Sequence, residues 1–147
     1  MSLESDYVPS PKGWVRDDVA KIEQAGDTNV VDRQGRPVIL VTMRGAKTGA
    51  VRKVPLMRVE HDGAFVLVAS QGGAPEHPKW YWNLKADPTA LMLQDGPEPH
   101  DYEARELEGD ERDPWWDRAV AAYPPYAEYQ ERTERVIPLF VATRADS

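Results

Sequence analysis

The sequence of 147 residues contains no cysteine and only three histidines. Without cysteine, the chain cannot form disulfides, iron–sulfur clusters, thiolate zinc sites or a cysteine nucleophile. His61, His77 and His100 have no second histidine or carboxylate at the spacing of a metal site. The sequence also lacks GxGxxG and GxSxG motifs. We therefore predict no metal centre, and an enzyme of this sequence would need a bound cofactor for difficult chemistry.

Long apolar runs are also missing. The mean hydropathy is −0.62, and no run approaches the roughly 18 apolar residues of a membrane-spanning helix. The N-terminal stretch MSLESDYVPSPKG has no apolar segment of the kind found in secretory signals. We expect one domain over residues 1–147, with residues 1–12 as a loose arm. The expected location is the cytoplasm, with at most peripheral contact at the inner face of the membrane.

Acidic residues are absent from one segment of an otherwise acidic chain. Residues 33–59 hold seven Lys and Arg and no Asp or Glu, although the formal net charge of the chain is −7. The other residues carry 11 basic and 25 acidic side chains. Proteins that bind duplex nucleic acid are usually basic over a whole face, so nucleic acid is not the expected partner. Two interpretations remain open: a focused site for a small anionic ligand, or a solvated basic hairpin.

Short apolar runs and turn signals divide the chain into strands and short helices. The predicted strands are residues 38–43, 53–60, 64–70, 90–94, 101–107 and 136–143. The predicted helices are residues 13–25, 80–86, 115–123 and 127–133. About six strands joined by tight turns, without βαβ alternation, predict a mainly β fold of the α+β type, either an antiparallel barrel or a sandwich.

Three local features give sharper structural predictions. Asp113 followed by Pro114 predicts the N-cap and the first position of a helix. Pro138 within the last apolar run predicts an edge or bulge position, because proline cannot donate a hydrogen bond to a neighbouring strand. The acidic run over residues 106–113 predicts a solvated loop.

Four motifs in three stretches of the chain carry a family resemblance. The stretches are RGAKTGAVRKVPLM, VASQGGAPEHPKWYWNLKADP and AAYPPYAEYQERTERVIPLFV, and the motifs within them are GxKTGxxR, ASxGG, HPxWYxNL and YPxYxxYQ. In this order and spacing, the sequence resembles the deazaflavin-dependent nitroreductase and quinone reductase family, small proteins that use coenzyme F420. The resemblance runs from about residue 37 to residue 141.

The resemblance implies a fold and an activity. The family has a split antiparallel β-barrel, and its coenzyme carries a phosphate and an oligoglutamate tail, whose negative charges would account for the basic segment. The implied function is an F420H2-dependent reductase that transfers a hydride from the reduced deazaflavin to a quinone-like acceptor or to an activated nitro-aromatic. The implied assembly is a monomer or a homodimer. Two alternatives are a reductase of related fold that uses FMN, and a carrier of the deazaflavin without turnover.

The resemblance also assigns site residues position by position. The residues that match the coenzyme-binding positions are Arg44, Lys47, Thr48, Gly49, Arg52, Pro55, Leu56, Met57, Ala69, Ser70, Gln71, Gly72, Gly73, Pro78, Lys79, Trp80 and Asn83. Those that would face the substrate are Tyr123, Tyr126 and Tyr129. Ser70 and Tyr126 are the expected catalytic residues, which would polarise or protonate the acceptor.

Plainer interpretations of the same residues stay open. Without the resemblance, Trp80 and its neighbours are the core of a short helix, and the three tyrosines are half-buried packing residues. Lys53 and Arg58 lie near the basic motif, but strand alternation would put one or both on the far face of the strand.

Overall fold

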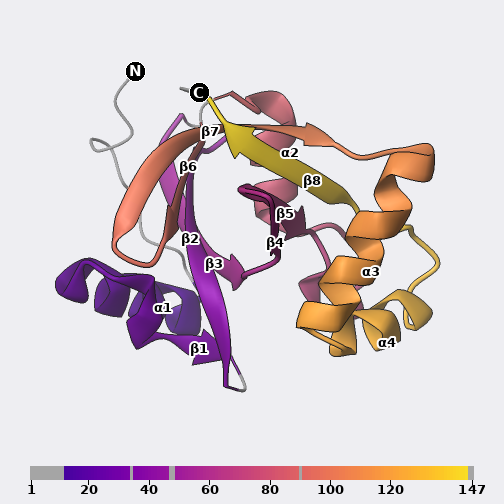
Figure 1. The fold of residues 1–147 in the computed structure, drawn as a ribbon, viewed down its shortest axis with the longest axis horizontal. Coiled ribbons are helices and arrows are strands. Elements are labelled where there is room, and N and C mark those ends of the chain that lie inside the picture. Colours follow the sequence, from indigo (N-terminus) through magenta and orange to yellow (C-terminus); the bar gives the residue numbers. More distant parts are fainter. Residues whose placement is uncertain (1–11, 34, 47–48, 90, 146–147) are drawn as a thin grey trace.

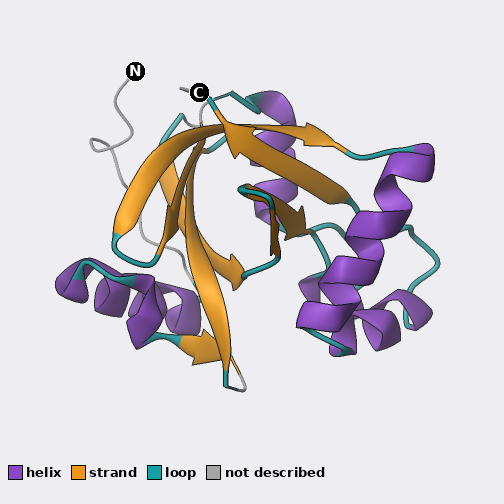
Figure 2. Ribbon diagram, in the orientation of Figure 1, coloured by secondary structure: helices purple, strands orange, loops and turns teal. Residues whose placement is uncertain are grey.

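The computed structural model describes residues 12–33, 35–46, 49–89 and 91–145, and the fold of these residues is drawn in Figures 1 and 2. The α-helices are α1 (Gly13–Ala25), α2 (Lys79–Ala86), α3 (Arg112–Ala122) and α4 (Pro125–Glu131). The strands are β1 (Asp32–Arg33), β2 (Arg36–Arg44), β3 (Val51–Met57), β4 (Glu60–His61), β5 (Ala64–Val68), β6 (Leu91–Asp95), β7 (Glu98–Glu106) and β8 (Leu139–Arg144). Three single turns of 3₁₀ helix are η1 (Thr28–Val30), η2 (Gln71–Gly73) and η3 (Gly109–Glu111).

The strands form one curled antiparallel sheet. Their order is β1-β2-β6-β7-β8-β5-β4, and β3 also pairs with β2. Within the described ranges, β3 pairs with no strand from the other end of this order, so the sheet curls without closing. Every strand pair is antiparallel. The predicted mainly β, split-barrel fold with a few short helices is therefore confirmed.

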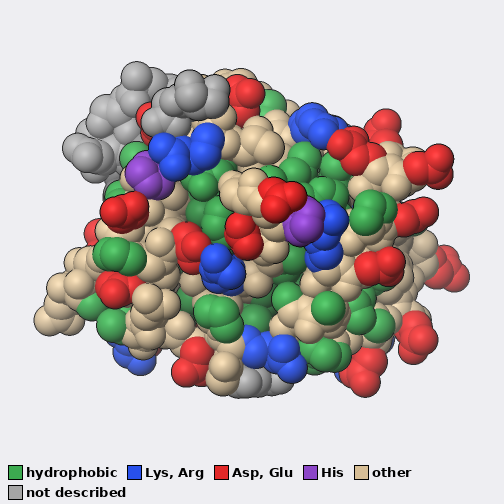
Figure 3. All heavy atoms as spheres, viewed as in Figure 1, with side chains coloured by type: hydrophobic (Ala, Val, Ile, Leu, Met, Phe, Trp, Pro, Cys, Tyr) green, Lys and Arg blue, Asp and Glu red, His purple; other side chains and the backbone are tan. Residues whose placement is uncertain are grey.

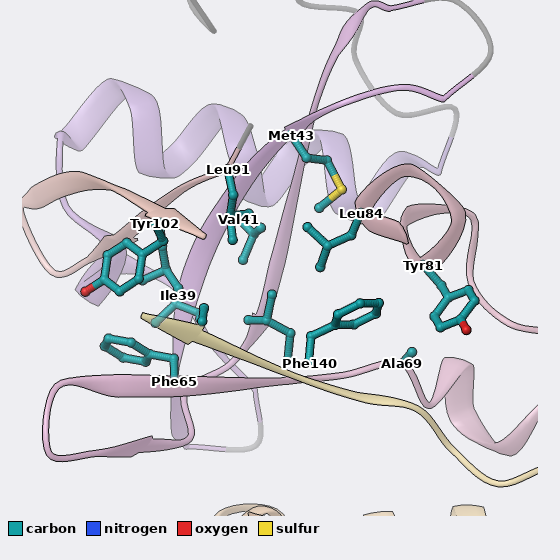
Figure 4. Close-up of a cluster of buried hydrophobic side chains, with 13 residues drawn as sticks. Ile39, Val41, Met43, Phe65, Ala69, Tyr81, Leu84, Leu91, Tyr102 and Phe140 are labelled. Carbon is teal, nitrogen blue, oxygen red and sulfur yellow. The ribbon is translucent and has the colours of Figure 1, made fainter. Parts of the chain in front are cut away.

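The concave side of the sheet surrounds the first apolar core, which we call the inner cluster (Figure 4). Alternate residues of β2, β3, β5, β6, β7 and β8 point into it, as the two-residue period of a strand requires. Its buried members are Ile39, Val41, Met43, Phe65, Leu67, Ala69, Tyr81, Leu84, Leu91, Leu93, Tyr102, Phe140 and Ala142. Helix α2 covers one end of the inner cluster with Tyr81 and Leu84.

Two further apolar clusters cover the outer faces of the sheet. Helix α1 packs Val15, Val19 and Ile22 against Val38 and Leu40 on the outer face of β2, and we call this the α1 cluster. Helices α3 and α4 pack against the outer faces of β5 and β8, and we call this the tyrosine cluster. Its buried members are Val59, Val66, Val68, Leu107, Trp115, Ala119, Tyr123, Tyr126, Ile137, Leu139 and Val141. In the described part of the chain, no helix combines the length and apolar character needed to cross a membrane.

Several predicted boundaries are wrong, and each has a local cause. The strand predicted over residues 53–60 runs over residues 51–57 and is followed by the separate β4. Helix α3 begins at Arg112, directly after η3, so Asp113 is not its N-cap. The acidic run is partly folded as η3, where Glu111 forms an ion pair with Arg105.

Proline explains two other corrections. Strand β8 lies between β7 and β5, so it is not an edge strand, and Pro138 precedes it rather than interrupting it. Its carbonyl still accepts a hydrogen bond from the Ala69 N–H at 3.0 Å. Helix α4 begins at Pro125, two residues before the predicted start, because proline is well suited to the first position of a helix.

The loop after β5 packs directly against α4, and glycine makes this possible. Gly73 has φ +81°, and a Cβ there would lie 2.7 Å from the Tyr129 carbonyl oxygen. Gly72 has φ +64°, but a Cβ there would meet nothing within 4 Å. The two neighbours therefore share the left-handed backbone that favours glycine, and only Gly73 has a close contact.

We predict that Gly73→Ala is more destabilising than Gly72→Ala. Both variants strain a backbone with positive φ, at a cost of roughly 1 kcal/mol. The collision with Tyr129 should lower the free energy of unfolding of Gly73→Ala by about a further 1–3 kcal/mol. Urea denaturation of both variants measures the difference. Equal losses would show that α4 moves freely away from the loop.

Candidate functional site

The glycine-rich loop at residues 69–74 has an unusual backbone. Gln71, Gly72 and Gly73 have φ values of 46°, 64° and 81° in succession. Gln71 is one of two non-glycine residues with positive φ among the described residues. The run cannot continue β5, because an extended strand needs negative φ at each position. The chain therefore turns sharply at the end of β5, next to the inner cluster that contains Ala69.

Arg135 holds this loop from one side. Its guanidinium donates to the carbonyl oxygens of Ser70 at 2.7 Å, Ala74 at 2.8 Å and Ala69 at 3.2 Å. Its Nη1 also lies 2.9 Å from His77 Nδ1. Burial lowers the pKa of Arg135 from its ordinary value. Sequence reasoning missed this residue, because none of the four motifs includes it.

His77 links the loop to α2. Its ring stacks on Tyr81, with the ring centroids 4.3 Å apart. Burial, and then the positive charge of Arg135, lower the pKa of His77. Both effects favour the neutral imidazole, whose Nδ1 accepts the hydrogen bond from Arg135. Pro78 then occupies the buried N-cap position of α2.

Strand β3 presents two different faces. Val54 and Leu56 pack against the inner cluster, and alternation puts Arg52 on the same face. Lys53 instead forms an ion pair with Glu23 of α1, and Met57 packs against the α1 cluster.

Strand pairing extends this division to the other predicted residues. Pro55 pairs with Leu40, a member of the α1 cluster, so Pro55 shares the α1-facing side of β3. Arg58 follows the strand and forms two hydrogen bonds with Asp95, at 2.8 and 3.1 Å. Of the predicted wall along the coenzyme, only Leu56 faces the inner cluster, and Val54 joins it although sequence reasoning missed it.

The loop between β2 and β3 is held by its own backbone and by Asn83. The Gly45 N–H donates to the Ala50 carbonyl at 2.7 Å, and Arg44 Nη1 donates to the Gly49 carbonyl at 2.8 Å. Asn83 Oδ1 accepts from the Ala46 N–H at 2.9 Å, which ties the loop to α2. Two predicted coenzyme contacts in this loop, Lys47 and Thr48, lie outside the described residues.

The two arginines that flank this loop lie on opposite faces of the hairpin. Arg52 pairs with Met43, which points into the inner cluster, whereas Arg44 pairs with Val51 one position further along. Because successive residues of a strand alternate between its two faces, the side chain of Arg44 leaves the backbone on the outer face. Its guanidinium then reaches the Gly49 carbonyl, so Arg44 shapes the loop.

The three tyrosines form one packed group. Tyr123 and Tyr126 have ring centroids 4.9 Å apart, and the hydroxyls of Tyr123 and Tyr129 lie 3.2 Å apart. Tyr126 is only 5% exposed. Burial, with smaller effects from the two neighbouring tyrosines, strongly raises the pKa of Tyr126. The hydrogen bond with Tyr123 and burial raise the pKa of Tyr129 to about 12, so both phenols are neutral at physiological pH.

Helix α2 contributes the remaining predicted residues. Trp80 is partly buried against the inner cluster, with its ring 6.4 Å from that of Phe140. Lys79 is exposed and lines a surface hollow of about 510 Å³. The other residues around this hollow are Pro75, Glu76, His77, Trp82 and Arg135. Figure 3 shows that acidic side chains gather along a different edge, the one formed by α3.

The inner cluster joins residues from two of the stretches that carry the family resemblance. Leu56 of β3, Ala69 after β5 and Trp80 of α2 all contact the inner cluster, and Leu56 and Trp80 remain partly exposed. Arg52 lies on the same face of β3 as Leu56. The tyrosine cluster lies on the opposite, outer face of β5, and it meets this region through the contact of Tyr129 with Gly73.

The sequence and the fold were compared with those of known proteins. The sequence model of the F420H(2)-dependent quinone reductases matches residues 14–144. An F420H(2)-dependent quinone reductase from Mycobacterium tuberculosis is 35% identical over 113 residues, which cover 74% of each chain.

Solved structures give the same picture. An F420-H2 dependent reductase is 57% identical, with a TM-score of 0.69 over 73% of this chain and 94% of that chain. A domain-swapped dimer is 53% identical, with a TM-score of 0.71 over 90% of this chain and 99% of that chain. An FAD-binding protein from Mesorhizobium loti, 15% identical with a TM-score of 0.53 over 87% and 86% of the two chains, shares the fold alone. The chain belongs to the F420H(2)-dependent quinone reductase family.

Proposed function

We propose that this protein binds reduced coenzyme F420 and reduces a quinone-like acceptor. The observation that carries the proposal is that the partly exposed Leu56 and Trp80 border the inner cluster to which the buried Ala69 belongs, in a chain of this family. These residues come from two of the stretches that carry the family resemblance, and all three belong to or border one apolar cluster. Reduction of activated nitro-aromatics by the same site is part of the proposal.

The residues present fit a flat, anionic coenzyme. Val54, Leu56 and Trp80 leave apolar surface partly exposed beside the inner cluster, where a ring system can stack. Gly49 and Gly72 have open space where a Cβ would stand, so a ligand can approach their backbone closely. Arg52, with Lys47 and Thr48, would hold the phosphate and the tail. When bound, the reduced coenzyme supplies the hydride.

The protein would contribute orientation and hydrogen bonds to the acceptor. We assign this role to Ser70, which begins the turn after β5, and to the hydroxyl of Tyr126. Because its pKa is raised, Tyr126 keeps its proton and remains a hydrogen-bond donor at physiological pH. A residue that is 5% exposed can meet an acceptor only at its edge, so we propose a hydrogen bond rather than stacking. Such a donor stabilises negative charge that grows on an acceptor oxygen.

We also propose a homodimer and a peripheral encounter with membranes. The domain-swapped relative, 53% identical to this chain, supports the dimer, and light scattering of the purified protein tests it. A lipid-soluble quinone would be met at the membrane surface, where Trp14 of α1 is 50% exposed. The mixed charges of α1 should keep the attraction to anionic lipid weak.

The first prediction from this proposal concerns Arg52, with Lys53 as its matched control. Arg52→Ala should weaken binding of the tailed coenzyme by roughly 10- to 150-fold, because a charge-assisted hydrogen bond to an anion is lost. Lys53→Ala should change it by less than about 3-fold, because Lys53 pairs with Glu23 on the other face. Titrations monitored by coenzyme fluorescence at several salt concentrations measure both. Salt-independent binding, with equal affinities in the two variants, would contradict the anionic-tail site.

The second prediction concerns Tyr126, with Tyr123 as its matched control. Tyr126→Phe should lower turnover of a soluble quinone by about one to two orders of magnitude, because one transition-state hydrogen bond is lost. Coenzyme affinity should stay close to that of the parent. Tyr123→Phe, in a similarly buried ring whose hydroxyl pairs with that of Tyr129, should lose much less turnover. Steady-state kinetics decide between them, and full activity of Tyr126→Phe would transfer the donor role to Ser70 or to a backbone N–H.

A single-turnover experiment tests the proposed function as a whole. Protein loaded with reduced F420 is mixed with a soluble quinone, and coenzyme oxidation is followed by absorbance. Oxidation at a rate that rises with quinone concentration supports an F420-dependent reductase. Tight binding without oxidation would indicate a carrier. Binding of FMN in preference to the deazaflavin would indicate a flavin enzyme of the same fold.

A further inference from the structure

Arg135 lies in the segment between α4 and β8, and it reaches back over more than sixty residues to the loop after β5. Its guanidinium contacts the carbonyl oxygens of Ala69, Ser70 and Ala74, on both sides of η2. The same side chain touches His77, just before α2. The guanidinium of Arg135 thus contacts both ends of the loop and also His77, which lies just before α2.

This arrangement fixes which way the peptide groups of the loop point. In a planar trans peptide, the C=O and the following N–H point in opposite directions, and no cis peptide occurs in the described chain. Because the carbonyls of Ala69 and Ser70 point toward Arg135, the N–H groups of Ser70 and Gln71 point away from it. The turn therefore presents the N–H groups of Ser70 and Gln71 on the side away from Arg135, whereas the Gly73 N–H donates back to the Ser70 carbonyl at 3.0 Å.

The backbone of Arg135 is itself held by α4. Gln130 Nε2 donates to the Arg135 carbonyl at 2.8 Å, and Gln130 Oε1 accepts from the Ile137 N–H at 3.0 Å. Both halves of one side-chain amide are thus used on the segment that carries Arg135. Four contacts of the guanidinium, together with this support, hold the partly buried cation in one orientation.

We propose that Arg135 is a positioning residue for coenzyme binding: it holds the carbonyls of the loop on one side and thereby presents the N–H groups of Ser70 and Gln71 to the oxygen atoms of the coenzyme ring. This inference rests on the proposed function. Without Arg135, the Ala69 and Ala74 carbonyls lose this donor, and the Ser70 carbonyl keeps the bond from the Gly73 N–H at 3.0 Å. The peptide groups of the loop can then rotate more easily, and a carbonyl oxygen turned toward the ring would repel those oxygens. The coenzyme would then lose donors without losing any direct contact to Arg135.

Arg132 supplies the matched control. It belongs to the same segment and has the same charge, and its guanidinium reaches the same loop only at 3.5 Å from the Gly72 carbonyl. It also lies over the ring of Tyr129. Removing Arg132 changes the charge as much as removing Arg135 does, but it leaves the three strong carbonyl contacts in place.

The test compares Arg135→Gln with Arg132→Gln by fluorescence titration of F420 and of a form without the glutamate tail. Arg135→Gln should weaken binding of both forms by about the same factor, 10-fold or more, as the loop meets the ring and not the tail. Arg132→Gln should stay within about 2-fold of the parent for both. Kinetics should show a larger rise in the KM for the coenzyme than in the KM for the quinone, a split that general loosening of the fold would not produce.

Chemical rescue gives a second readout. Guanidinium ion at millimolar concentration should restore coenzyme affinity to Arg135→Ala by about 3-fold or more, and an equal concentration of sodium chloride should not. If Arg135→Gln does not fold, Gln130→Glu decides by the same titration. That variant keeps Arg135 and replaces the amide donor to its backbone carbonyl with a carboxylate oxygen, which repels that carbonyl, and it should weaken both coenzyme forms.

The outcomes separate the two proposals. If the parent protein binds neither form of the coenzyme, the proposed function fails, and this inference fails with it. If the parent binds normally and Arg135→Gln binds as the parent does, the inference alone is overturned. A loss confined to the tailed form would also overturn it, because Arg135 would then act through long-range charge.

Discussion

The alternation of side chains along β3 is the constraint on which the candidate site depends. A strand has two faces, and α1 occupies one of them through the Lys53–Glu23 ion pair and the packing of Met57. The face left for a ligand carries Arg52, Val54 and Leu56. The basic segment is thus divided by the two-residue period of the strand, and it does not act as one patch. Arg58 is likewise engaged, with Asp95.

The open sheet explains why an exposed apolar face is present at all. Strands β3 and β5 both border the inner cluster, yet within the described chain they do not pair with each other. A closed barrel would bury Val54 and Leu56 completely, whereas here both stay partly exposed. A flat ligand can cover them without any rearrangement of the core, and the apolar surface it removes from water then contributes to its affinity. Trp80 also borders the inner cluster and stays partly exposed.

The sequence predicted the fold class and most elements, because apolar periodicity and turn residues are local signals. Helix α1 was predicted with its exact bounds, since Gly26 takes the left-handed conformation that ends it. The errors occur where contacts between residues that are far apart in the sequence determine the local structure. Pro138 predicted an edge or bulge position, but β8 lies between β7 and β5, and the Pro138 carbonyl accepts from the distant Ala69 N–H. The strand predicted over residues 53–60 was placed two residues late, because pairing with β2 sets its true register.

The candidate site was only partly predictable, for a related reason. Motifs reveal residues that stand close together in the sequence, such as those of the glycine-rich loop. Arg135 donates to backbone carbonyls more than sixty positions away. Every residue has such a carbonyl, so no sequence pattern indicates this contact. Likewise, the stretch RGAKTGAVRKVPLM includes Pro55 and Leu56 equally, and only the packing of α1 shows that they face opposite sides.

The position of α4 has a consequence for how variants of the tyrosines should be interpreted. This helix supports the glycine-rich loop twice, through the backbone of Tyr129 against Gly73 and through Gln130, which holds Arg135. Truncating a tyrosine ring creates a cavity beneath this helix and moves the loop as well. A loss of coenzyme affinity in such a variant therefore does not identify a coenzyme contact. Removing only the Tyr126 hydroxyl leaves the packing of the ring in place, so it separates acceptor chemistry from the support of the loop.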